Sequence, residues 1–411
     1  MPGSSPRESR KIPTLYRDPN LLIVFGVTLM AVLGVSSITP AFPRIGRAFG
    51  LPSQAVGSLI TAFTLPGVVL TPLLGVLADR WSRKRLLIPS LMVFGLAGGA
   101  CSLVRDFELL LVLRFAQGTG AASLSVLYIT LIGDLFRGES RTVAMGYNAS
   151  VVSIGTAVYP LIGGALATLG WAYPFVLPLL ALPLGLLVLF GLENPEPKVE
   201  QGLRSYLEQA WESIRHPQAV GLFALTLLTF VIIYGAYLTY LPFLMESAFQ
   251  ASPLVIGIAM SGMSLATALT SSQLGRLTKL WPQRTLLRAS CVLFAAALLT
   301  IPLAPTLSTL GIPILLLGLA QGLSIPNLQT LLASLAPIEH RGAFLSINGV
   351  ILRLGQTLGP PLMGLAFGVW GIDSTFYAGA GIAAGMLVLT MTAITARGEQ
   401  SRQRCFPDSQ R

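Results

Sequence analysis

Residues 75–85 read Gly75-Val76-Leu77-Ala78-Asp79-Arg80-Trp81-Ser82-Arg83-Lys84-Arg85. This stretch holds one acid and four bases, and it separates two apolar runs, 56–74 and 86–103. Each run has the length of a helix that crosses the hydrocarbon core of a bilayer. The sequence therefore predicts a loop of roughly ten residues between two spanning helices, with its bases at the cytoplasmic surface of the membrane.

The composition is typical of a membrane protein and excludes an ordinary soluble domain. The 411 residues have a mean hydropathy of +0.72 and only 11% charged residues, where a soluble domain carries roughly 25%. The formal net charge of +10 comes from short basic clusters between apolar runs, so it indicates topology and no nucleic-acid partner is expected. The two histidines and three cysteines lie far apart, so neither a metal site nor a cofactor is expected.

Twelve apolar segments are long enough to cross a bilayer. An even number places both chain ends on one side, and most Arg and Lys residues lie on that side; the loops opposite hold only Arg44, Arg47 and Arg105. This bias predicts a multi-pass protein of the cell (plasma or inner) membrane with both termini in the cytoplasm. The predicted spans are 21–43, 53–74, 86–104, 108–133, 144–169, 172–192, 218–244, 253–273, 286–304, 309–335, 344–368 and 374–396.

The two halves of the chain repeat each other two hundred residues apart. Several matches in one register indicate a duplicated six-helix unit. The matched pairs include Arg141 and Arg341, Asn148 and Asn348, Gly155 and Gly355, and Pro160 and Pro360.

A polar interruption, 194–217, separates the two halves. Its prolines end the sixth span, and Leu203, Leu207 and Trp211 then recur at helical spacing. We expect an amphipathic helix on the inner membrane surface; a linker without a helix is the alternative. The expected organisation is a cytoplasmic tail (1–20), a first six-helix bundle (21–193), this linker (194–217), a second six-helix bundle (218–396) and a second cytoplasmic tail (397–411).

The stretch around Asp79 resembles the signature that joins the second and third helices of the major facilitator superfamily, G-x-L-A-D-R-x-G-R-K. Only Ser82, where the family has glycine, departs from it. The resemblance covers about 21–396 and implies a conformational switch at this membrane surface. Solvated loop charges of little energetic weight are the alternative. The expected switch residues and their neighbouring charges are Gly75, Asp79, Arg80, Arg83, Asp134 and Arg141.

The fourth span carries a charge. Arg114, Gln117, Gly118 and Gly120 match the family's R-x-x-Q-G-x-G motif. The resemblance implies that Arg114 faces a central cavity and takes part in proton handling. The alternative is an arginine that extends to the outer membrane surface, since the span begins only a few residues earlier.

The fifth span resembles G-x-x-x-G-P-x-x-G-G, a motif of the drug:proton antiporters. Tyr159 replaces its central glycine, which puts close packing against the eighth span in question. The eleventh span has a similar pattern. Small-residue packing without any transport role is the alternative. The motif residues are Gly155, Pro160, Gly163 and Gly164, with Gly355, Gly359 and Pro360 in the second half.

Polar side chains in the spans that line the family's cavity are candidates for a substrate or proton site. Arg353, near mid-depth of the eleventh span, has no basic counterpart in the first half, where Ser153 stands. An unpaired arginine there costs at least about 2.5 kcal/mol, so carbonyls, water or an anionic substrate should offset its charge. Helix–helix hydrogen bonds are the alternative role for each residue. The candidates are Arg114, Gln117, Tyr234, Tyr237, Gln321, Asn327 and Arg353.

We therefore expect an all-α integral membrane protein with twelve transmembrane helices in two pseudo-symmetric six-helix bundles, the major facilitator fold. The resemblance implies a monomeric secondary transporter in a lipid bilayer that works by alternating access. Proton-coupled efflux of small apolar or amphipathic compounds is favoured, although no acid lies in the middle of a span. The alternatives are a carrier of organic anions that uses Arg114 and Arg353, and a ligand sensor without transport. Neither a Walker loop nor a nucleophile–base pair placed for catalysis is visible, so we expect neither ATP drive nor an enzyme.

Overall fold

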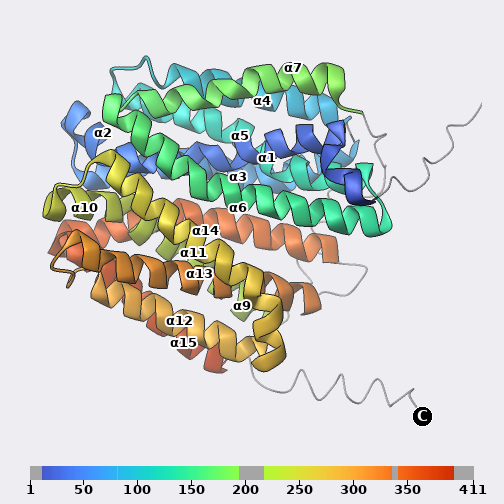
Figure 1. Cartoon of the computed structure of the whole chain (residues 1–411). Coiled ribbons are helices and arrows are strands. Elements are labelled where there is room, and N and C mark those ends of the chain that lie inside the picture. Colours follow the sequence, from blue (N-terminus) through green and yellow to red (C-terminus); the bar gives the residue numbers. More distant parts are fainter. Residues whose placement is uncertain (1–11, 81, 194–216, 336–340, 393–411) are drawn as a thin grey trace, which may run out of the picture.

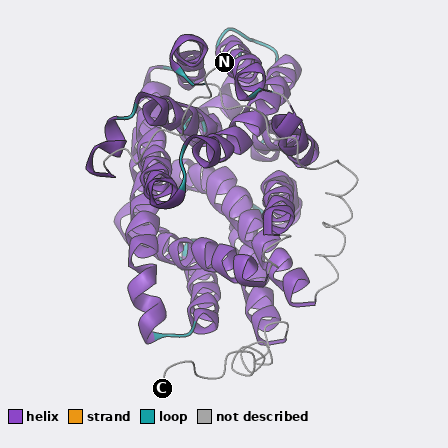
Figure 2. Cartoon of the chain, turned by 90° about the vertical axis from the view of Figure 1, so that its right-hand side faces the viewer, coloured by secondary structure: helices purple, strands orange, loops and turns teal. Residues whose placement is uncertain are grey.

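The computed structural model describes residues 12–80, 82–193, 217–335 and 341–392, and these form helices without any strand among them (Figure 1). Within these ranges the chain passes twelve times along one helical body. We call the end where the first pass begins the terminal end, and the opposite end the distal end. Helices make up nearly all of the described chain, with short connecting loops (Figure 2). The expected all-α fold with twelve spans is confirmed.

The first half contributes six passes, preceded by η1 (Ile12–Arg17). They are α1 (Pro19–Ser36), which continues through η2 (Thr39–Ala41) into α2 (Phe42–Phe49); α3 (Ser53–Arg80); α4 (Arg83–Ala100); α5 (Phe107–Leu135); α6 (Gly138–Leu169); and η3 (Tyr173–Leu180), which continues into α7 (Ala181–Gly191).

The second half repeats this order. It consists of α9 (Pro217–Ile232), which continues through the π-helical segment η4 (Ile233–Tyr240) into α10 (Leu241–Phe249), then α11 (Pro253–Leu280), α12 (Gln283–Thr300), α13 (Leu307–Leu335), α14 (Arg341–Trp370) and α15 (Ile372–Thr392). The bounds of α11, α12 and α13 lie two hundred residues beyond those of α3, α4 and α5 at both ends. The duplication inferred from the sequence is thus repeated in the helix boundaries.

Short-range signals set several helix ends. The Asp106 carboxylate accepts a hydrogen bond from the Leu109 backbone N–H over 2.8 Å and caps α5. Gly50 ends α2 in the left-handed region with a φ of 62°, where glycine carries no steric penalty.

The predicted loop at 75–85 is wrong, because α3 continues to Arg80 and α4 begins at Arg83. The apolar run marks where the chain meets hydrocarbon, but a helix satisfies its own backbone groups and can continue into the headgroup region. At 28 residues, α3 is about 42 Å long, while the hydrocarbon core is about 30 Å thick. The amphipathic helix expected within 194–217 lies outside the described residues.

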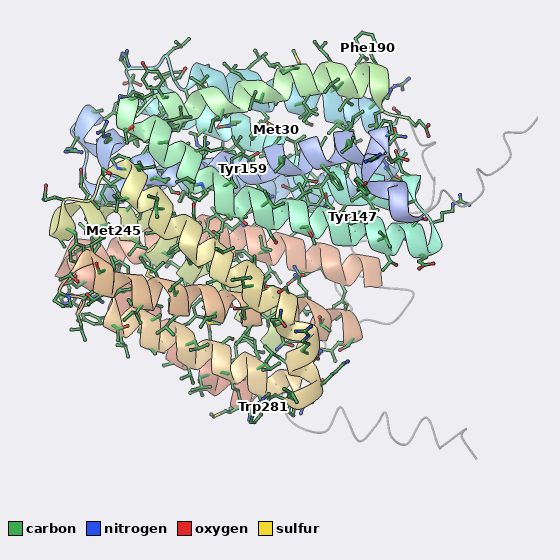
Figure 3. The ribbon with its side chains drawn as sticks, viewed as in Figure 1. Met30, Tyr147, Tyr159, Phe190, Met245 and Trp281 are labelled. Carbon is green, nitrogen blue, oxygen red and sulfur yellow. The ribbon has the colours of Figure 1, made fainter. Side chains whose placement is uncertain are left out.

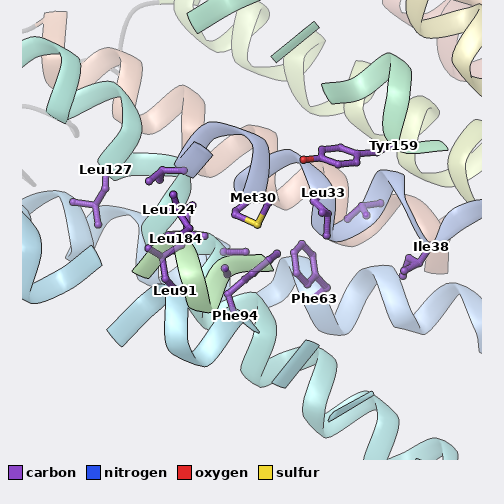
Figure 4. Close-up of a cluster of buried hydrophobic side chains, with 14 of the residues drawn as sticks. Met30, Leu33, Ile38, Phe63, Leu91, Phe94, Leu124, Leu127, Tyr159 and Leu184 are labelled. Atoms are coloured by element: carbon purple, nitrogen blue, oxygen red, sulfur yellow. The ribbon is translucent and has the colours of Figure 1, made fainter. Parts of the chain in front are cut away.

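Two apolar cores form, one in each half. In the first, Met30, Leu33, Phe63 and Phe94 gather between helices that are distant in sequence (Figure 4). The outer surface is apolar too: Phe190 and Trp281 project from opposite sides of the body and are 83% and 56% exposed (Figure 3). Among the described helices, nine are long and apolar enough to cross a membrane. Of the others, α4 and α12 carry basic residues in their first turn and α14 carries Arg353. The chain is a multi-pass membrane protein.

The halves meet along two helix pairs, α3 against α14 and α6 against α11. At the distal end an ion pair of 2.5 Å joins Arg47 of α2 to Glu246 of α10. Nearby, the Thr39 hydroxyl donates to the sulfur of Met260 over 3.7 Å. These contacts join the two halves at the distal end.

Candidate functional site

The middle of the interface between the halves holds Arg353, which lies near the centre of α14. Its Nη1 donates to Oε1 of Gln356 over 3.0 Å, one turn along the same helix. Its Nη2 donates across the interface to the Ser125 hydroxyl of α5. Gly67 of α3 leaves room for the side chain, because an added Cβ there would lie 3.1 Å from Cδ of Arg353. Arg353 therefore joins α14 to two helices of the first half.

Further polar contacts between the halves lie on the distal side of Arg353, and they are made by hydroxyl groups. The Thr61 hydroxyl donates to the Thr357 carbonyl over 3.2 Å, and the hydroxyls of Thr64 and Thr357 lie 2.9 Å apart. Thr357 also donates from its hydroxyl to the Arg353 carbonyl over 2.9 Å. Sequence reasoning missed Ser125, Gln356 and these threonines. A threonine in an apolar span usually bonds its own helix, so no local pattern marks the ones that cross an interface.

Tyr234 lies at the start of η4. Its side chain is close enough to that of Gln356, the partner of Arg353, to interact with it. Its ring lies 6.1 Å from that of Phe230. Phe230 in turn lines a shallow, open hollow between α9, α13 and α14. The remaining lining residues are Thr226, Ile325, Leu328, Gln329, Asn348 and Leu352. The second half thus presents an aromatic and aliphatic surface on α9, α13 and α14, the last of which also carries Arg353.

Arg114 lies inside the first half and does not reach the surface. It has no exposed area. Its Nη1 donates to Oε1 of Gln117 over 2.7 Å, its Nε donates to the Leu59 carbonyl over 3.3 Å, and its guanidinium lies 4.2 Å from the centre of the Phe63 ring. All these partners belong to α3 and α5, so a role in the central cavity stays a prediction.

Three other cavity candidates lie within the second half. The Tyr237 hydroxyl donates to the Met260 carbonyl over 3.2 Å, and Asn327 donates from its side chain to the Gln283 carbonyl over 2.7 Å. Oε1 of Gln321 is buried without a hydrogen-bond partner among the described residues. The bonds of Tyr237 and Asn327 join helices of one half. This is the helix–helix hydrogen bonding that the sequence analysis gave as the alternative to a cavity role.

The expected switch is described in part. Arg83 and Asp134 form an ion pair of 2.8 Å. The Arg141 guanidinium lies beside Gly133 on α5. The structure describes only the helical backbone at Gly75, Asp79 and Arg80, so their switch role stays a prediction.

The glycine and proline motifs lie at close helix contacts. A Cβ on Gly163 would clash with the Ser37 carbonyl, and one on Gly164 with the Pro253 carbonyl of α11. Across the same contact, Gly257 faces the Pro160 carbonyl. Close packing of α6 on α11 is therefore retained although Tyr159 replaces a glycine.

The remaining motif glycines also face backbone or side chains of other helices. Gly118 meets the Phe63 carbonyl, and Gly355 meets that of Leu227. Gly359 faces the Gly235 backbone in η4. Gly155 faces only the flexible side chain of Leu29 among other helices. The Tyr240 hydroxyl donates to the Pro360 carbonyl over 3.4 Å.

Comparison with known proteins identifies relatives along the whole chain. The sequence profile of the Major Facilitator Superfamily matches residues 24–250 and 239–404. Multidrug resistance protein 1 of Bacillus subtilis (strain 168) is 23% identical over 363 residues, which are 88% of this chain and 92% of that protein. The 3-(3-hydroxy-phenyl)propionate transporter of Escherichia coli (strain K12) is 29% identical over 397 residues, which are 92% and 94% of the two chains.

Solved structures share the fold. A bacterial homolog to the human lysosomal transporter Spinster, in an inward-facing and occupied conformation, has a TM-score of 0.76 and 18% identity. The match covers 96% of this chain and 98% of that chain. At this level of identity the likeness concerns the arrangement of helices alone.

Proposed function

Because this chain belongs to the Major Facilitator Superfamily, whose members transport by alternating access, we propose that it exports small apolar or amphipathic compounds in exchange for protons. The composition of the interface between the halves carries this proposal. Among the described residues in its middle, Arg353 is accompanied by threonines, tyrosine, phenylalanine and leucine. Apolar walls with a few polar groups suit amphipathic ligands. The resemblance to Multidrug resistance protein 1 points the same way.

Export requires loading from the cytoplasm. Between described residues, the hydrogen bonds and ion pairs that join the halves lie at the distal end or near the middle of the body. Substrate would then enter from the terminal end in this conformation. If the termini are cytoplasmic, as the distribution of bases predicts, this is the loading side.

The orientation has a direct test at Cys405. In a variant that lacks Cys101 and Cys291, an impermeant thiol reagent should leave Cys405 unlabelled in intact cells and label it after lysis. Labelling in intact cells would reverse the topology and, with it, the direction of transport.

The proposed driving force is the proton gradient. No Asp or Glu lies in the middle of a described span, so the proton would be carried by a group nearer a helix end, such as Asp134 or Glu246. Purified protein in sealed vesicles with an imposed pH gradient should accumulate amphipathic dyes. Nigericin, which collapses the pH gradient, should abolish this accumulation, whereas valinomycin alone should not. Accumulation that survives nigericin would refute proton coupling.

A second candidate is a carrier of organic anions. It is favoured by Arg353, because among the described residues no carboxylate pairs with this arginine. The resemblance to the 3-(3-hydroxy-phenyl)propionate transporter, named for an aromatic carboxylate, agrees with it. The same vesicle assay with neutral, cationic and anionic dyes separates the two candidates. Ligand binding without flux for every dye would indicate a sensor.

A further inference from the structure

We propose that Arg353 receives the acid group of an amphipathic anion, which takes the place of the Ser125 hydroxyl and thereby releases a bond between the two halves. This inference rests on the proposed export function and names both its substrate class and the contact through which substrate acts. Its elements are the two hydrogen bonds of Arg353, the charge of its surroundings and the apolar hollow beside it.

The two bonds of Arg353 differ in what they connect. Gln356 belongs to the same helix as Arg353, so its bond survives any rigid movement of α14. Ser125 belongs to α5 of the first half, so its bond must break when the halves separate at this depth. Separation therefore leaves Nη2 of Arg353 in need of another acceptor.

The charge of Arg353 favours an anion as that acceptor. Its hydrogen-bond partners among the described residues, Ser125 and Gln356, are both neutral, and none of the ion pairs of the described residues includes Arg353. A hydroxyl offers a single neutral oxygen, whereas the two oxygens of a carboxylate accept two parallel N–H groups of a guanidinium and neutralise its charge. A carboxylate is thus the stronger partner once the interface opens.

The surface beside Arg353 suits an apolar body attached to that acid. Asn348, Leu352 and Gln356 follow one another at four-residue intervals on one face of α14. The first two line the hollow and the third accepts from Arg353, so the hollow begins one helical turn from the partner of the guanidinium. Asn348 is 6% exposed, and its Oδ1 has no hydrogen-bond partner among the described residues. The ligand would lay its apolar part against Phe230 and Leu352.

The binding test uses three probes of similar shape and different charge: 1-naphthaleneacetate, its neutral amide and 2-(1-naphthyl)ethylamine. Thermal unfolding of the purified protein in detergent reports the stabilisation by each probe. In the wild type, the acid should stabilise at lower concentrations than the amide or the amine. In Arg353→Gln the dissociation constant of the acid should rise roughly tenfold or more, while that of the amide stays unchanged.

The Ser125→Ala variant separates this proposal from a merely structural tie. It removes the neutral partner that the anion must displace and leaves the charge in place, so the acid should bind at least as tightly as to the wild type. Arg353→Lys keeps the charge without the paired N–H groups and should fall between wild type and Arg353→Gln. Ser153→Ala is the matched control for Ser125→Ala. Ser153 occupies the position in α6 that Arg353 occupies in α14, and its hydroxyl bonds its own helix, so its loss should leave acid binding unchanged.

Three results would overturn the inference: equal stabilisation by acid and amide, unchanged acid binding in folded Arg353→Gln, or weaker acid binding in Ser125→Ala. If Arg353→Gln does not fold, the Ser125→Ala result decides. Flux in vesicles keeps this inference apart from the proposed function. Proton-driven flux of the amide in both wild type and Arg353→Gln, without selective acid binding, would leave export standing and refute the anion site. Selective acid binding without flux would support the anion site and refute export.

Discussion

Nε of Arg83 donates a hydrogen bond to Oδ2 of Asp134 over 2.8 Å, and this ion pair joins the first turn of α4 to the last turn of α5. The two side chains are only 4% and 17% exposed. A charge pair withdrawn from water to this degree is sensitive to the loss of either partner, because the other charge stays behind.

Asp134→Asn should therefore destabilise the folded protein, by about 1–3 kcal/mol, since the amide keeps an acceptor but loses the charge. Glu139→Gln is the matched control, because Glu139 is an exposed acid in the first turn of α6. Thermal unfolding in detergent should show a lower midpoint for Asp134→Asn alone. Equal midpoints for the two variants would show that the pair contributes nothing.

Arg114 offers a comparison between a buried and an exposed pair of the same kind. Gln117 accepts from Arg114 three residues away with both side chains fully buried, and Gln273 accepts from Arg276 at the same spacing with both exposed. Gln117→Leu leaves a buried cation short of an acceptor and should cost about 1.5–3 kcal/mol. Gln273→Leu should change stability by less than about 0.5 kcal/mol. A similar loss in both would mean that burial of Arg114 does not matter.

The distal ion pair between Arg47 and Glu246 should affect the balance between conformations. Its side chains are 68% and 23% exposed, so its contribution is about 1 kcal/mol at most and falls with added salt. Glu246→Gln should shift spin-label distances between Ala48 and Ala248 towards longer values, measured by electron spin resonance. Arg44→Gln is the control, because the one hydrogen bond of Arg44 to a described residue goes to the Thr168 carbonyl of its own half. Unchanged distances in Glu246→Gln would exclude a role in distal closure.

The spans and the duplication could be predicted from sequence because they depend on local composition. Apolar runs gave the twelve passes, and residues such as Gly155 and Gly355 gave the register of the repeat. The end of α3 was predicted too early, because hydrophobicity reports the contact with lipid and not the continuity of the helix. The π-helical segment η4 was not predicted, although Pro242, which lacks a backbone N–H, follows it closely.

The candidate site was predictable only where a single residue raises the free energy of inserting its helix into the membrane. Arg353 was found because a charge in a span requires compensation. Ser125 was not, because a serine in a helix can bond its own backbone and costs little there. Its importance arises from one hydrogen bond between α5 and α14, a long-range contact that one sequence does not encode in any short pattern.

The glycines of α6 allow the last prediction, a graded series within one helix. An added Cβ would clash with the Ser37 carbonyl at Gly163 and with the Pro253 carbonyl at Gly164, but would meet only the movable Leu29 side chain of another helix, 3.1 Å away, at Gly155. At Gly146 it would meet no atom within 4 Å. Rigid backbone cannot give way as a side chain does, so the four sites should differ.

Alanine at Gly163 or Gly164 should lower stability by about 1–3 kcal/mol, and alanine at Gly155 by less. Alanine at Gly146 should raise it by up to about 1 kcal/mol, because alanine is the better helix former. Gly164→Ala should also reduce flux more than Gly163→Ala, since Gly164 faces α11 across the interface and Gly163 faces its own half. Thermal midpoints and vesicle flux measured on all four variants check this order. Equal effects at Gly146 and Gly163 would show that helix propensity, and not close helix contact, determines the need for glycine in α6.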